Sequence, residues 1–76
     1  MNEKLFEKKT EFIKAYEKAL VLDDRSNVKD IVLRYDDIYE NEIISIFFNG
    51  GGRRDILATG NSNYANAKAI LEAVYG

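Results

Sequence analysis

The spacing of apolar residues changes twice along this chain of 76 residues. It follows a helical period from about Asn2 to Val21, alternates from 28 to 59, and returns to a helical period from 63 to 75. A period near 3.6 residues predicts an amphipathic helix, whereas a period of two predicts a half-buried strand. We therefore expect one α+β domain over residues 1–76, with a helix before and after a sheet.

Turn-forming residues divide the alternating region into three strands, expected at 28–36, 42–48 and 53–59. Asn49 and the three glycines after it are typical of a tight hairpin turn, and short connections favour an antiparallel meander. Each helix has a single apolar stripe, so we expect both helices to pack on one face of the sheet. The predicted buried layer of the sheet consists of Ile31, Leu33, Tyr35, Ile44, Ile46, Phe48, Ile56 and Ala58.

Two details of the helices are expected from the same periodicity. Lys9 falls within the apolar arc of the first helix, so its ammonium group either reaches water along that face or meets a partner. The last helix is expected to place Asn66 on its outer side. Its inward stripe is predicted to be Tyr64, Ala67, Ile70, Leu71 and Val74.

The composition removes several kinds of chemistry. The chain has no cysteine and no histidine, and its 13 acidic and 11 basic residues give a formal charge of -2. It therefore has no disulfide framework, no thiol nucleophile and neither of the two commonest zinc ligands. We expect a protein that is not an enzyme and holds no metal or cofactor. No apolar run resembles a signal peptide or a membrane span, so a cytoplasmic location is expected.

The face of the sheet opposite the helices is expected to be more apolar than a solvated face usually is. Its apolar residues are predicted to form one contiguous patch. Such patches on small proteins often mark binding surfaces, although strand propensity alone also favours these residue types. If the face is used, it binds a protein partner or a second copy of the chain. The candidate residues of this open face are Val32, Arg34, Ile43, Phe47 and Leu57.

The connection between the first two strands is acidic, whereas the far hairpin carries Arg53 and Arg54. The acidic residues lack the alternating spacing and central glycine of a calcium loop. Two interpretations remain: solvated turns collect charge, or the turn is an acidic knob that docks onto a basic surface. The candidate residues of this acidic turn are Asp36, Asp37, Glu40 and Glu42.

The order of elements resembles the double-stranded-RNA-binding domain, and the likeness includes Thr59-Gly60-Asn61-Ser62 before an alanine-rich last helix. That family places lysines at the start of this helix to contact phosphates. This chain has Asn63-Tyr64-Ala65-Asn66-Ala67 there, with Lys68 nearby. The resemblance implies the fold, while the acidic balance makes RNA binding through Lys68, Arg53 and Arg54 an alternative hypothesis.

The stretches NVKDIVLRYDD, EIISIFFNGGG and TGNSNYANAKAILEAV are similar in style to small phage and mobile-element proteins of Gram-positive bacteria. That set includes anti-CRISPR proteins, and the resemblance implies an inhibitor that acts by stoichiometric binding. It identifies no binding residue. The leading hypothesis is a non-enzymatic protein-binding module that blocks a host nucleic-acid enzyme through an acidic surface. The alternatives are the RNA binder and a structural homodimer subunit.

Overall fold

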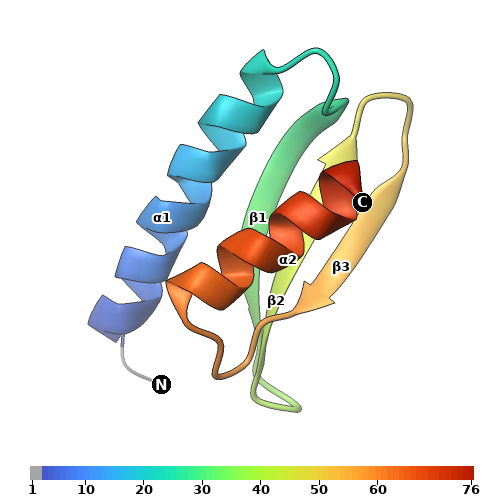
Figure 1. The fold of residues 1–76 in the computed structure, drawn as a ribbon. Helices are drawn as coiled ribbons and strands as arrows, with labels where there is room; N and C mark the ends of the chain where they lie inside the picture. Colours follow the sequence, from blue (N-terminus) through green and yellow to red (C-terminus); the bar gives the residue numbers. More distant parts are fainter. Residues whose placement is uncertain (1–2) are drawn as a thin grey trace.

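The computed structural model describes residues 3–76, which form two helices and one three-stranded sheet (Figure 1). The order α-β-β-β-α confirms the predicted α+β fold. The predicted start of the first helix at Asn2 lies outside the described residues. The elements are α1 (Glu3–Leu22), β1 (Val28–Asp36), β2 (Asn41–Phe48), β3 (Arg53–Leu57) and α2 (Asn63–Tyr75).

The strand boundaries differ from the prediction mainly at the end of β3, which stops at Leu57 rather than Thr59. The Ala58 N–H still donates to the Glu42 carbonyl. At Thr59, however, the hydroxyl rather than the backbone is used, because its Oγ1 accepts the Glu42 N–H at 2.9 Å. Gly60 then adopts φ 76°, a left-handed conformation that favours glycine, and the chain turns towards α2.

The sheet is an antiparallel meander in the order β1-β2-β3, and both helices lie on the same face of it (Figure 1). α1 runs along β1, and α2 crosses the sheet obliquely. The predicted inward layer is confirmed, since Ile31, Leu33, Ile44, Ile46 and Ala58 are buried. The remaining members of that layer, Tyr35, Phe48 and Ile56, are half-buried, and Phe48 and Ile56 pack against the core.

The inward face of α2 matches the prediction at Ala67, Ile70 and Val74 and differs from it at three other positions. Tyr64 is 79% exposed and Leu71 also faces solvent, whereas Asn66 is completely buried beside Ala67 and Ile70. The helix is therefore rotated slightly from the predicted orientation, and Asn66 joins its packed side. Alanines on this side allow close packing, and the wide Tyr64 ring is left outside. The amide oxygen and nitrogen of Asn66 have no hydrogen-bond partner among the described residues.

Side chains of α1 occupy part of the free edge of β1. The Glu17 carboxylate accepts the Ile31 N–H at 3.1 Å, and the Lys14 ammonium lies 3.5 Å from the Ile31 carbonyl oxygen. These bonds occupy backbone groups that another strand would need for pairing. Both helices lie on the inward face, so no helix covers the outer face of the sheet (Figure 1).

The C-terminal ends of the two helices are joined by one hydrogen bond, in which the Tyr75 hydroxyl donates to the Asp23 carboxylate. This bond is the largest cause that lowers the pKa of Asp23, and the Arg25 backbone N–H lowers it further. The same bond raises the pKa of Tyr75, because it requires the protonated hydroxyl. The bond therefore links α2 to the loop after α1.

Candidate binding surface

The outer face of the sheet is a regular grid of side chains. Strand pairing places Asp30 opposite Phe47 and Phe47 opposite Arg53, and this row repeats along the strands with a spacing of two residues. The next two rows are Val32–Ser45–Asp55 and Arg34–Ile43–Leu57. All five predicted open-face residues therefore lie on one face, with their neighbours now defined.

A polar network crosses the middle of this face. The Arg34 Nε donates to the Ser45 hydroxyl at 2.9 Å, and that hydroxyl donates to the Asp55 carboxylate at 2.8 Å. Arg53 completes the network, with its guanidinium 3.3 Å from the same carboxylate. Ser45 is fully buried although it faces away from the helices, because the side chains around it cover it. The network holds Arg34 across the sheet and towards β3.

This network divides the apolar patch that was expected to be contiguous. Ser45 lies between Phe47 and Ile43 along β2, so the apolar side chains are separated in the centre of the face. Val32, Phe47 and Ile43 are half-buried, whereas Leu57 is 65% exposed. The exposed apolar area is therefore concentrated beside Leu57 and its cross-strand partner Ile43, near the acidic turn.

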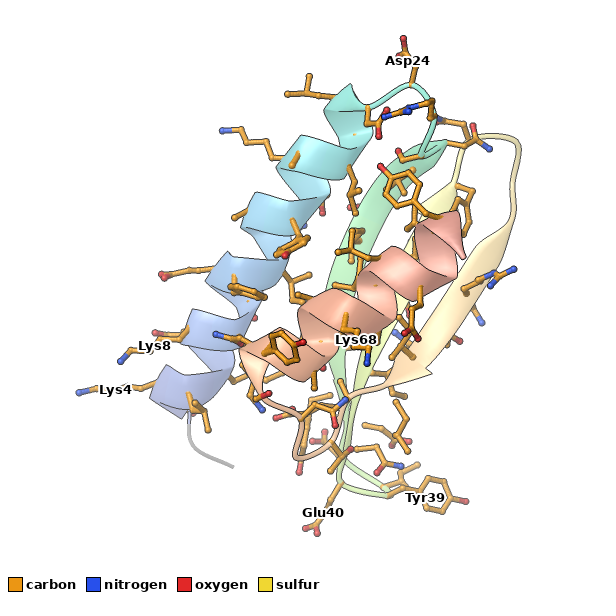
Figure 2. All side chains as sticks on the ribbon, viewed as in Figure 1. Lys4, Lys8, Asp24, Tyr39, Glu40 and Lys68 are labelled. Atoms are coloured by element: carbon orange, nitrogen blue, oxygen red, sulfur yellow. The ribbon has the colours of Figure 1, made fainter. Side chains whose placement is uncertain are left out.

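The acidic turn is held by its own backbone. Asp36 pairs with Asn41 across the strands, and the Asp36 carboxylate accepts the Ile38 N–H at 3.0 Å. Glu40 adopts φ 55°, which reverses the chain into β2. Figure 2 shows Tyr39 and Glu40 at the tip of the turn, pointing away from the body of the protein. Ile38 is 83% exposed, so the turn presents a large apolar side chain as well as carboxylates.

Glu42 belongs to the opposite side of the sheet. Its carboxylate lies 2.9 Å from the Lys9 ammonium, and the two side chains are only 14% and 11% exposed. Lys9 thus follows neither of the interpretations offered by the sequence, because it is neutralised inside the protein. Of the predicted acidic residues, Asp36, Asp37 and Glu40 remain at the surface of the turn.

The three remaining carboxylates of the turn have no cationic side chain within ion-pairing distance among residues 3–76. Tyr35, which precedes Asp36 on β1, lies in the electric field of these carboxylates. Burial raises the pKa of Tyr35, and the carboxylates of Glu40, Asp37, Glu42 and Asp36 raise it further. The turn therefore forms a region of unbalanced negative charge.

The open face and the acidic turn meet at a shallow hollow of about 370 Å³. Ile38 and Ile43 form its apolar walls, Asp36 and Asp37 lie at its rim, and Arg34 and Tyr35 complete the lining. We use the name turn-side patch for the surface made by Ile38, Ile43, Leu57, Asp36, Asp37 and Glu40. The sequence analysis did not include Ile38 among the candidate residues, although a large apolar residue between carboxylates of a turn was a visible signal.

The other end of the sheet is electrically mixed rather than basic. The Asn27 amide donates to the Asn49 carbonyl at 3.1 Å, which places the loop after α1 beside the glycine hairpin. That loop carries Asp23 and Asp24, and Figure 2 shows Asp24 at the pole opposite the acidic turn. The expected contrast between an acidic and a basic pole is therefore reduced to one clearly acidic end.

Comparison of the chain with protein-family models, with curated proteins and with solved structures finds no match. In the part of the chain that the structure describes, no group of three or more metal-ligating side chains converges. Over residues 3–76, neither helix is both long and apolar enough to span a bilayer.

Proposed function

We propose that this chain is a non-enzymatic protein-binding module that docks a partner protein on its turn-side patch. One observation carries the proposal: Ile38, the most exposed apolar side chain of the turn, lines the hollow together with Ile43, Asp36 and Asp37. Ile43 in turn pairs across the strands with Leu57, the most exposed apolar side chain of the sheet face. Apolar area that stays in water in the free protein becomes a source of binding energy when a partner covers it.

The charge of the patch indicates the kind of partner. Asp36, Asp37 and Glu40 make no ion pair among residues 3–76, so a basic surface would gain attraction from all three without first displacing an internal ion pair. Basic surfaces of this type are found where enzymes hold nucleic-acid phosphates. A small acidic protein that covers such a surface acts as a stoichiometric inhibitor, and it would meet its target in the cytoplasm.

The size of the sheet face favours a different protein over a second copy. With about 4.8 Å between strands and about 3.4 Å per residue, the nine, eight and five residues of β1, β2 and β3 cover roughly 360 Å². Stable interfaces bury about 800 Å² on each partner. The sheet face alone is therefore too small for a stable homodimer, and two copies would also carry the same acidic rim. A basic partner that covers the turn as well as the sheet face would bury more area and would carry the opposite charge.

Site-specific photocrosslinking tests the proposal. Benzoylphenylalanine is placed at Leu57 in one variant and at Leu22 in a control, since Leu22 is 81% exposed but lies at the end of α1. In the cells that naturally contain the chain, we expect a crosslinked partner at position 57 and none at position 22. Crosslinking at 22 alone, or a covalent dimer of the chain at 57, would contradict the proposal.

The partner identified in this way is then purified and titrated by calorimetry. The triple variant Asp36→Asn, Asp37→Asn, Glu40→Gln should bind it at least tenfold more weakly, and the affinity of the unmodified chain should fall as salt is added. Glu42 is left unchanged because its ion pair with Lys9 belongs to the folded core. Equal affinity of the triple variant would show that the acidic rim does not contribute.

A further inference from the structure

We infer that the hollow at the junction of turn and sheet receives an arginine side chain of the partner, an inference that rests on the proposed function. The lining of the hollow combines apolar and acidic side chains. Ile38 and Ile43 offer an apolar surface for the methylene stem, and Asp36 and Asp37 lie at the rim for the charged head. The negative charge of Asp36 and Asp37 therefore favours a cationic side chain of the partner in the hollow.

Arg34 lines the hollow but does not neutralise it. Its Nε donates to Ser45, and its terminal nitrogen lies 3.9 Å from the Asp55 carboxylate on β3. Both contacts draw the guanidinium across the sheet and away from the turn. The internal arginine is thus engaged elsewhere, and the carboxylates at the rim are left for a cation from outside.

Arginine fits this site better than lysine. A planar guanidinium presents parallel N–H groups that match carboxylates in pairs, and it is more weakly hydrated than an ammonium group. Removing water from the charged group therefore costs less free energy for arginine than for lysine when the side chain is brought against Ile38 and Ile43. Asp36 accepts the Ile38 N–H with one carboxylate oxygen, and Asp37 is exposed. Neither carboxylate makes an ion pair among residues 3–76.

The inference is tested on the whole chain by heteronuclear NMR with N-acetyl-arginine methylamide at low salt. We expect saturable shifts of the Ile38 and Ile43 amide signals. The matched compound N-acetyl-citrulline methylamide has nearly the same shape but no charge, and it should shift these signals at least fivefold less. Equal shifts with both compounds, or shifts with neither, would overturn the inference.

Two variants add a control for simple long-range attraction. Asp37→Asn removes a charge of the hollow that makes no ion pair within the described part of the chain, and it should weaken arginine binding at least threefold. Asp24→Asn removes the same charge at the opposite pole, and it should leave binding unchanged (Figure 2). An equal effect of the two variants would show that net charge, not the hollow, attracts the probe.

The outcomes separate this inference from the proposed function. If the partner crosslinks at Leu57 but binds the Asp37→Asn variant with unchanged affinity, the arginine site is wrong and the docking surface stands. If the partner instead crosslinks only at Leu22, the docking surface is wrong whatever the probe does. Support for both requires the crosslink at Leu57 and a loss of partner affinity in Asp37→Asn.

Discussion

The ion pair between Lys9 and Glu42 ties α1 to β2, and the variant Lys9→Met measures what it contributes. Methionine keeps most of the volume and the flexible stem of lysine, so the packing between helix and sheet is largely retained. The change removes the ammonium group and leaves the Glu42 carboxylate, which is only 14% exposed, without its cation.

The magnitude follows from the geometry. At 2.9 Å the Coulomb attraction is roughly 6 kcal/mol for an effective dielectric constant of about 20, and the cost of desolvating both charges cancels part of it. Loss of one partner from a fully buried pair costs about 3–5 kcal/mol. Since both side chains keep some contact with water, we expect Lys9→Met to lower the free energy of unfolding by about 2–3 kcal/mol.

Urea denaturation followed by circular dichroism measures this loss. A domain of this length has a total stability of roughly 4–11 kcal/mol, so the shift of the midpoint should be large. Lys8→Met is the matched control, because Lys8 is the adjacent lysine and projects away from the sheet (Figure 2). It should change stability by less than about 0.5 kcal/mol.

A double-mutant cycle with Glu42→Gln isolates the interaction itself. We expect Lys9→Met and Glu42→Gln to be non-additive by at least about 1 kcal/mol, because each removes the same ion pair. A coupling energy near zero would refute the reasoning, since it would mean that the two groups do not interact in solution. Equal losses for Lys9→Met and Lys8→Met would refute it as well.

Three further changes test other parts of the fold. Asn66→Ala should raise the free energy of unfolding by about 1 kcal/mol in urea melts, because it removes a buried amide without partners and improves helix propensity; a loss of similar size would contradict this. Tyr75→Phe should lower stability at neutral pH, because it removes the hydrogen bond to Asp23. The stability that Asp23 contributes is present above its ordinary pKa of 3.8 and is lost as the pH falls through its lowered pKa, whereas the stability that Tyr75 contributes is present below its ordinary pKa of 10 and is lost as the pH rises. Thermal melts across this pH range should show a weaker dependence on pH at both ends in the variant. Gly51→Ala should lower the free energy of unfolding by about 1–2 kcal/mol, because Gly51 has a φ of 100°. Gly52→Ala should be neutral or slightly stabilising, because the added Cβ would meet Phe48 at an ordinary 3.9 Å. Equal effects of the two variants in melts would show that the turn is not held in this conformation.

The candidate surface was predictable in its parts but not in its assembly. Alternation along β1 and β2 correctly assigned Val32, Arg34, Ile43 and Phe47 to one face, because the period of a strand is two whatever it packs against. The same argument placed Leu57 there. It could not show that Ser45 would be bridged by Arg34 and Asp55, since that depends on which residues the strand register brings together.

Charged and helical positions were less predictable for a related reason. Glu42 lies only two residues beyond Glu40, so in the sequence both belong to one acidic run, yet the alternation at the start of β2 turns Glu42 to the helix side. There it meets Lys9, 33 residues earlier in the chain. For α2, Tyr64 and Leu71 were predicted to face inward and Asn66 outward, and the structure shows the reverse. The difference is a small rotation of the helix, which its packing against the sheet decides.

The sequence by itself determined the local structure: two helices, three strands and their turns follow from the spacing of apolar residues and from glycines, which act over a few neighbouring positions. Only the tertiary structure decided which charges are neutralised and which stay free, as with Glu42 and Asp37. Electrostatic and packing contacts join residues that are far apart in the chain, and such contacts exist only after the sheet has its register and the helices have their rotation.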